Sequence, residues 1–132
     1  AAVAAALRHP GRQVVALVGD GGFMMTGNEL ATAIAARASP KIIIANNSSY
    51  GVIRAHQEAA YPGRVIATRL VNPDFAAMAR AYGATGLVIA APTDVQDIIE
   101  EALATPGPVV VDVKTSLERI NAFRRLGDFR RP

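Results

Sequence analysis

Four short apolar runs dominate the pattern of hydrophobic and polar positions along this chain. They are residues 13–18, 41–45, 87–90 and 109–113, and each contains β-branched side chains. Runs that are apolar at nearly every position, rather than at every second one, are typical of strands buried on both faces of a parallel sheet. The pattern therefore predicts an α/β fold, with a doubly wound, mostly parallel sheet flanked by helices.

Segments with helical periodicity separate these runs. Asn72 and Pro73 have the residue types of an N-cap and a first helical position. Pro92 begins a segment whose apolar residues recur at three- and four-residue spacing, as on one face of a helix. The predicted helices are residues 1–9, 28–38, 52–58, 72–83 and 92–103.

The first two predicted strands both end in polar turns. Gly-Asp-Gly-Gly follows the first strand at residues 19–22, and two asparagines follow the second at 46 and 47. A right-handed crossover places such strands in one sheet in the same direction, so both turns emerge at its carboxyl edge, where open α/β sheets bind ligands. Glycines let backbone N–H groups approach an anion, and a following helix directs its positive end to the same place. We therefore predict a phosphate-binding loop at residues 19–22.

Asp20 and Asn47 supply hard oxygen ligands at neighbouring strand ends, about 5–10 Å apart given a strand spacing of about 4.8 Å. One small cation can bridge them. Mg²⁺ takes one or two carboxylate-type ligands and completes its octahedron with substrate phosphates and water. An asparagine in place of a second aspartate avoids another negative charge opposite a diphosphate. The sequence therefore predicts a Mg²⁺ site that also holds a phosphate group.

The two motifs together resemble the thiamine diphosphate motif, in which GDG is followed about two dozen residues later by NN. Residues 22–45 separate Gly21 from Asn46 here. The sequences GDGGFMMTGNELATA and NNSSYG look like those of the acetolactate synthase and benzoylformate decarboxylase group. In that family the aspartate of GDG, the second asparagine and a backbone carbonyl two residues later hold Mg²⁺. The resemblance thus implies Asp20, Asn47 and the carbonyl of Ser49 as metal ligands.

The resemblance further implies a lyase or carboligase that acts on small 2-keto acids with thiamine diphosphate and Mg²⁺. Because the cofactor spans two domains, usually from different subunits, a homodimer or tetramer is also implied. No residue of this chain is predicted to be catalytic. The predicted cofactor-binding residues are Gly19, Asp20, Gly21, Gly22, Asn47, Ser49, Tyr50, Gly51 and Val52.

The chain looks like the C-terminal piece of such an enzyme. Residues 1–9 have helical composition but no preceding cap, so we expect their helix to begin upstream. In the family, the upstream region supplies a pyrimidine-binding domain with the glutamate that activates the cofactor. We therefore expect missing N-terminal domains of the same protein as partners and no activity from this piece alone. Residues 1–115 are predicted as the diphosphate- and Mg²⁺-binding domain, and residues 116–132 as a C-terminal helix and basic tail.

Other interpretations of the motifs stay open. Decarboxylases of the pyruvate type carry a catalytic glutamate at the position of Arg54, which argues against simple pyruvate decarboxylation, although a solvated helix residue explains Arg54 equally well. The alternatives are a noncatalytic regulatory subunit that binds the cofactor, a methyltransferase-like glycine loop in residues 14–22, and two ordinary turns. A dinucleotide-binding loop is weaker, since it would need a glycine at Met24.

Composition narrows the class of protein. The chain has 132 residues, 51% of them hydrophobic, which suffices for one domain with a real core. Its formal charge of +3 arises in residues 116–132, so we expect no nucleic acid as partner. No apolar run approaches the roughly 18 residues of a membrane span, so we expect no membrane partner. With no cysteine, a cytoplasmic location is the default.

Some apolar side chains outside the predicted strands also have expected positions. We expect the following to be buried in the core: Phe23, Met24, Met25, Met78 and Tyr82. We expect four residues of the tail to dock on the body of the domain or on a partner: Leu117, Ile120, Phe123 and Leu126.

Overall fold

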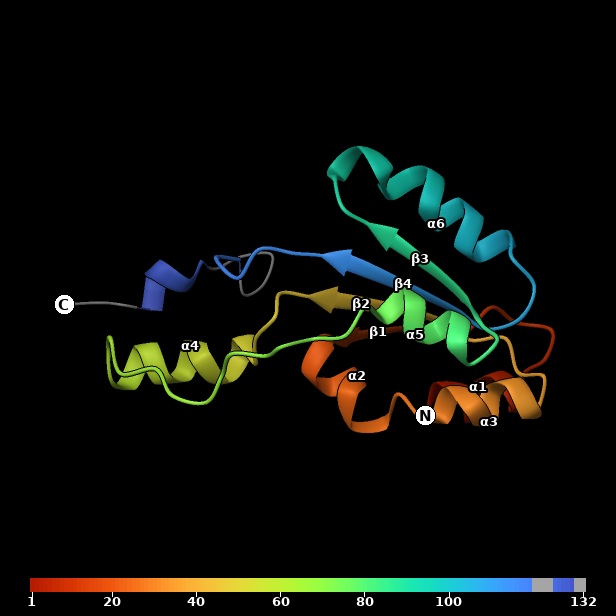
Figure 1. Ribbon diagram of the computed structural model, residues 1–132, viewed down its shortest axis with the longest axis horizontal. Helices are drawn as coiled ribbons and strands as arrows, with labels where there is room; N and C mark the ends of the chain where they lie inside the picture. Colours follow the sequence, from red (N-terminus) through yellow and green to blue (C-terminus); the bar gives the residue numbers. More distant parts are fainter. Residues whose placement is uncertain (120–124, 130–132) are drawn as a thin grey trace.

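A computed structural model describes residues 1–119 and 125–129. In this part of the chain four parallel strands form one sheet in the order β1-β2-β4-β3 (Figure 1). The doubly wound parallel sheet expected from the four apolar runs is therefore confirmed. The strands are β1 (Val15–Gly19), β2 (Lys41–Asn46), β3 (Thr85–Ile89) and β4 (Val109–Lys114).

Helices cover both faces of the sheet. In Figure 1, α6 lies on one side of the strands, whereas α1, α2, α3 and α5 lie on the other. None of the described helices is long and apolar enough to cross a membrane. The helices are α1 (Ala2–Arg8), α2 (Asp20–Thr26), α3 (Glu29–Ala35), α4 (Gly51–Ala60), α5 (Phe75–Ala81) and α6 (Val95–Ala104), with the 3₁₀ turns η1 (Pro92–Asp94) and η2 (Leu126–Phe129).

Alternate residues of β4 enter two separate cores, because successive side chains of a strand point to opposite faces of the sheet. Val110 packs with residues of α2, α3 and α5 on one face, where the rings of Phe23 and Phe75 meet edge to face with centroids 5.5 Å apart. Val109 and Val111 pack against α6 on the other face. The sheet is thus held from both sides at β4.

One part of the sheet departs from the prediction. Residues 13–18 were expected to form a strand buried on both faces, but β1 is an edge strand that is covered on one face only. Val15 is 51% exposed and Leu17 77% exposed. The physical reason is that α6 packs on β3 and β4, and no described element covers β1 on that face. An unbroken apolar run therefore does not by itself establish burial on both sides.

The helix boundaries also differ from the prediction at two places that bear on function. Helix α2 begins at Asp20, so Asp20, Gly21 and Gly22 form the first turn of a helix rather than a loop. This helix ends at Thr26, and Gly27 separates it from the start of α3. The N-cap of α5 is Asp74, whose carboxylate accepts a hydrogen bond from the N–H of Ala77 at 2.8 Å. The assignment of Asn72 as that N-cap was wrong, which leaves its side chain available for another role.

The apolar side chains singled out from the sequence have mixed positions. Phe23 lies in the core, but Met24 and Met25 are exposed, because they lie on the opposite side of α2 from Phe23 and Val18. Leu126 is buried, and its N–H donates to the carbonyl of Glu118 at 2.8 Å, so this part of the tail docks on the body beside α4. Ile120 and Phe123 fall outside the described residues.

Candidate cofactor and metal site

The two motifs lie side by side at the carboxyl edge of the sheet. Strand β1 pairs with β2 in parallel, with Gly19 opposite Ala45, so the residues that follow both strands emerge together. Asp20 is the first residue of α2, where a carboxylate interacts favourably with the positive end of the helix. The sheet and its crossover thus place Asp20 and the two asparagines at the carboxyl ends of paired strands.

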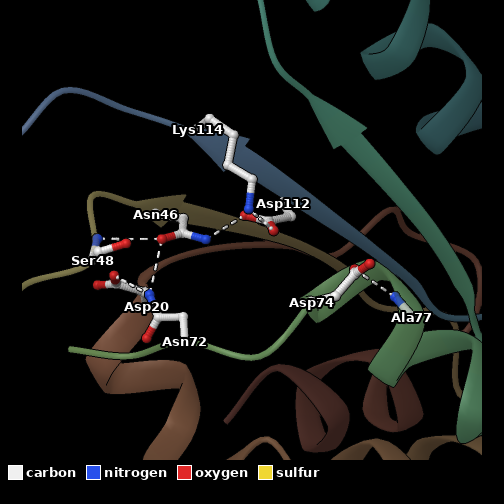
Figure 2. A network of polar contacts seen from close by, with 8 residues as sticks. All are labelled: Asp20, Asn46, Ser48, Asn72, Asp74, Ala77, Asp112 and Lys114. Atoms are coloured by element: carbon white, nitrogen blue, oxygen red, sulfur yellow. Dashed lines mark hydrogen bonds and ion pairs between the residues drawn. The ribbon is translucent and has the colours of Figure 1, made fainter.

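Asp20 is a buried carboxylate whose hydrogen bonds come only from neutral groups. It is 2% exposed. Its Oδ1 accepts the N–H of Gly21 at 2.9 Å, and its Oδ2 accepts from Nδ2 of Asn72 at 2.7 Å (Figure 2). No lysine, arginine or histidine among the described residues lies within ion-pair distance of it. A carboxylate has about four lone-pair sites, so Asp20 retains the capacity to bind a cation that would neutralise it.

Asp112 offers a contrast on the same edge. This residue of β4 is as deeply buried as Asp20, but its Oδ2 lies 2.6 Å from Nζ of Lys114. Its Oδ1 accepts from Nδ2 of Asn46 at 2.8 Å. The charge of Asp112 is therefore compensated within the chain, whereas that of Asp20 is not. Buried charges in proteins are paired or coordinate metals, so Asp20 is the carboxylate of this edge that fits a metal ligand.

The two asparagines of the NN motif differ in the same respect. Oδ1 of Asn46 accepts from the N–H of Ser48 at 3.3 Å and from Nδ2 of Asn72 at 2.9 Å, which uses both of its lone pairs. Among the described residues, Oδ1 of Asn47 accepts only from the N–H of Ser49, at 3.0 Å. Asn47 thus keeps a free lone pair, and Asn46 does not. Of the two asparagines, Asn47 has the amide oxygen with room for a cation, and its role as a metal ligand stays a prediction.

A strap of residues 66–72 fixes the turn that follows β2. The N–H of Tyr50 donates to the carbonyl of Thr68 at 2.8 Å, and the N–H of Leu70 donates to the carbonyl of Ser48 at 2.9 Å. Ser49 is buried and its hydroxyl donates to the Thr68 carbonyl at 2.8 Å. Ser48 adopts a positive φ of 55°, which turns the chain toward α4. The predicted metal ligand Ser49 is therefore held by its side chain as well, a role that the sequence did not reveal.

The glycines of the first turn of α2 make room for neighbouring side chains. A Cβ at Gly21 would lie 2.3 Å from Cε1 of Tyr50, and a Cβ at Gly22 would lie 3.2 Å from a methyl group of Val18. Gly21 therefore allows the ring of Tyr50 to lie against α2, and Gly22 allows the helix to pack closely on β1. The sequence predicted close approach of a phosphate at these glycines, and that role stays a prediction.

The remaining predicted residues lie at the start of α4. Gly51 is its first residue, and Val52 is exposed. Further along the helix, Arg54 is not simply solvated: it forms a 3.9 Å ion pair with the buried carboxylate of Glu58, and its Nε is buried without a hydrogen bond. Gly51 and Val52 thus lie beside the turn at Asn47, and their contact with a ligand stays a prediction.

Two polar residues of this edge were missed by sequence reasoning. The sequence analysis assigned Asn72 as an N-cap, so it did not predict the contacts of this residue with Asp20 and Asn46. Asp112 had a usable signal, because it is the one polar residue within the apolar run 109–113. No group of three or more His, Cys, Asp and Glu suited to a metal occurs among the described residues. The predicted set, with one carboxylate, one amide and one carbonyl, does not require such a group.

Comparison with known proteins identifies the family. Residues 1–113 match the model of the thiamine pyrophosphate enzyme C-terminal TPP binding domain. The acetolactate synthase of Bacillus subtilis is 36% identical over 112 residues, which cover 85% of this chain and 20% of that protein. The mitochondrial acetolactate synthase catalytic subunit of Saccharomyces cerevisiae is 34% identical over 114 residues, covering 86% of this chain and 17% of that protein.

A solved structure agrees with these relatives. The crystal structure of benzoylformate decarboxylase from Polynucleobacter necessarius superposes with a TM-score of 0.82 and 27% identity, covering 89% of this chain and 23% of that one. The chain thus spans about a fifth of the length of the curated relatives that it matches. By its sequence match and its fold, this chain belongs to the thiamine pyrophosphate enzymes and corresponds to their C-terminal cofactor-binding domain.

Proposed function

We propose that this chain binds the diphosphate of thiamine diphosphate through Mg²⁺, within a lyase or carboligase that acts on 2-keto acids. The observation that carries the proposal is the buried carboxylate of Asp20, which has only neutral donors among the described residues. It follows a strand that is paired with the strand before Asn47, whose amide oxygen keeps a free lone pair. A divalent cation would compensate this charge. Asp20, Asn47 and the carbonyl of Ser49 are the proposed protein ligands of the metal.

The first turn of α2 is the proposed cradle for the diphosphate. The first N–H groups of a helix have no partner within the helix, and together with its dipole they favour an anion. Gly21 already donates its N–H to Asp20, so the N–H groups beyond it remain for phosphate oxygens. Mg²⁺ at Asp20 would add a positive charge at the same place. The helix and the metal would therefore hold the diphosphate jointly.

Residues of this chain bind and orient the cofactor in this proposal, and none of them transfers a proton. When bound, thiamine diphosphate supplies an electron sink for making or breaking a carbon–carbon bond at the carbonyl of a keto acid. Tyr50, Gly51 and Val52 would border the cofactor from the start of α4. Arg54 pairs with Glu58 at the position where pyruvate-type decarboxylases carry a glutamate, which argues against simple pyruvate decarboxylation.

The rest of the active enzyme would come from other parts of the protein. The relatives are about five times as long as the segment matched here, which supports N-terminal domains that complete the cofactor site. We propose a homodimer or tetramer on the grounds of family resemblance, and a cytoplasmic location as the default for a chain without cysteine. The 132-residue chain alone should not turn over a 2-keto acid, and turnover by the purified chain would contradict this proposal.

Calorimetry on the full-length protein tests the proposed function. Thiamine diphosphate should bind in the presence of Mg²⁺ and not in the presence of a chelator. S-adenosylmethionine, the ligand expected of a methyltransferase-like domain, should not bind. A carboligation or decarboxylation product from a panel of 2-keto acids would then exclude a noncatalytic regulatory subunit. Cofactor binding that is equally tight without any divalent cation would rule out the proposed metal site.

A further inference from the structure

Asn72 connects the proposed metal ligand to the rest of the polar network. Its Nδ2 lies 2.7 Å from Oδ2 of Asp20 and 2.9 Å from Oδ1 of Asn46, so one amide group bridges the ends of β1 and β2 (Figure 2). Asn72 follows Asp20 by 52 residues and Asn46 by 26 residues along the chain. We propose that Asn72 is a positioning residue that holds the carboxylate of Asp20 in the orientation required to bind the cation. The inference rests on the proposed function.

The chemistry of the neighbours dictates how the amides are oriented. Asp112 can only accept hydrogen bonds, so Asn46 must direct its Nδ2 toward it and its Oδ1 away from it. That Oδ1 and the Asp20 carboxylate are both acceptors, so Asn72 must direct its amide nitrogen toward them. The hydrogen bonds therefore diverge from Nδ2 of Asn72, toward Asp20 on one side and, through Asn46, toward Asp112 on the other. No other orientation of the two amides satisfies both ends.

Hydrogen bonds of the neighbouring residues fix the position of the Asn72 backbone. The N–H of Leu70 bonds to the carbonyl of Ser48, and Ser49 pairs with Arg69 in an isolated antiparallel bridge. This register fixes the strap two residues before Asn72, beside the turn that follows β2. Asp74 then caps α5 and fixes the chain two residues after it. Asn72 is thus anchored on both sides while its own side chain is used for Asp20.

The hydrogen bond of Asn72 leaves Asp20 able to bind a metal. Oδ1 and Oδ2 each accept one neutral donor, and a carboxylate oxygen has a second lone-pair site. With both oxygens fixed in this way, the carboxylate cannot rotate freely about its Cβ–Cγ bond. Partners of this kind around a metal ligand commonly change metal affinity 10- to 100-fold, that is, by roughly one to two orders of magnitude. The expected effect of removing Asn72 lies in this range.

A pair of variants in the full-length protein tests the inference. Asn72→Ala should weaken Mn²⁺ binding in the presence of thiamine diphosphate by about tenfold or more, and should change the electron paramagnetic resonance spectrum of the bound Mn²⁺. Asp94→Ala is the control, because it removes side-chain hydrogen bonds at the start of another helical segment without contacting Asp20 or the 66–72 strap. The control should lower the unfolding midpoint but leave Mn²⁺ affinity and the spectrum as in the wild type. Unchanged affinity in Asn72→Ala, or tighter binding because the amide competes with the cation, would overturn the inference.

A second measurement, in the metal-free protein, separates this inference from the proposed function. Asn72→Ala and Asp20→Ala should shift the unfolding midpoint by less in combination than the sum of the single shifts, because both remove the same hydrogen bond. Additive shifts would show that the side chains of Asn72 and Asp20 do not interact, and would overturn the inference. If instead the wild type bound no divalent cation with the cofactor while the two variants still coupled, the proposed function would fail and the contact alone would stand.

Discussion

The amino end and the carboxyl end of the sheet each bury a charged side chain at a helix terminus. At the amino end, Lys41 is 5% exposed and its Nζ donates to the carbonyls of Thr105 and Gly107, at 2.5 and 2.8 Å, just beyond the C-terminus of α6. At the carboxyl end, Asp20 lies in the first turn of α2. Both charges therefore have the sign that the adjacent helix end favours. The two ends differ in how completely the chain satisfies the charge.

Lys41 uses two of its three donors on carbonyls of the turn before β4, so it joins β2 to that turn and serves the fold. Asp20 receives two neutral donors and keeps its remaining lone pairs at the edge where parallel α/β sheets bind ligands. A buried charge that the chain satisfies itself indicates a structural role. A buried charge that retains unused capacity at the carboxyl edge indicates a ligand.

The largest effect should follow from Asp20→Asn. The substitution removes the uncompensated negative charge, so Mg²⁺ and thiamine diphosphate affinity should fall together by at least about 100-fold, more than for a residue that only orients a ligand. Without ligands the variant should be as stable as the wild type or more so, because it no longer buries an unpaired charge. Calorimetry and thermal unfolding of the full-length protein measure both. Unchanged Mg²⁺-dependent cofactor binding would remove Asp20 from the metal site.

Gly21→Ala should affect both binding and folding at the carboxyl end. The new methyl group would overlap the ring of Tyr50, and overpacking of this kind costs about 1–3 kcal/mol. Alanine favours a helix over glycine by roughly 0.5–1 kcal/mol, which offsets only part of this cost, so a net loss of stability is expected. Displacement of Tyr50 should also weaken cofactor binding. Gly11→Ala is the control, because its Cβ would meet nothing within 4 Å. Wild-type stability and affinity in Gly21→Ala would show that Tyr50 can move away freely.

Lys41→Met should reduce stability without changing cofactor affinity. It removes two hydrogen bonds, each of roughly 0.5–1.5 kcal/mol, and recovers part of this because no charge is then buried. Burial lowers the pKa of Lys41 below its usual 10.5. As the pH rises through the folded pKa toward 10.5, the unfolded chain binds more protons, so the wild type should gain stability there relative to the variant. Denaturant unfolding of both proteins across this window gives the difference. A flat difference would mean that Lys41 titrates alike in both states.

The apolar runs and helical periodicities were enough to predict the parallel sheet and most of its helices, because these patterns are local. They were not enough for β1, whose outer face stays open at Leu17, since exposure depends on which helix lies over which strand. The positions of Asp20 and Asn47 at neighbouring strand ends were predictable, because the carboxyl ends of parallel strands meet at one edge of the sheet. Asn72 was not, because its sequence context fits an N-cap equally well and its partners are brought to it only by the pairing of the 66–72 strap with residues 48–50.

The smallest effects should come from the hydroxyl groups of two residues that support the proposed metal site. Ser49→Ala removes a buried hydrogen bond to the carbonyl of Thr68, but that carbonyl still accepts the N–H of Tyr50, so the cost should be near 1 kcal/mol.

Thr68→Val is its counterpart, because Oγ1 of Thr68 is buried without a hydrogen-bond partner, and the loss of such a hydroxyl should be neutral or stabilising. Cofactor affinity should stay near that of the wild type in both variants, since the proposed ligand at residue 49 is the backbone carbonyl. Thermal unfolding separates the two variants, and calorimetry checks the shared affinity. A large loss of Mg²⁺ affinity in Ser49→Ala, with Thr68→Val unaffected, would mean that the hydroxyl group itself takes part in the metal site.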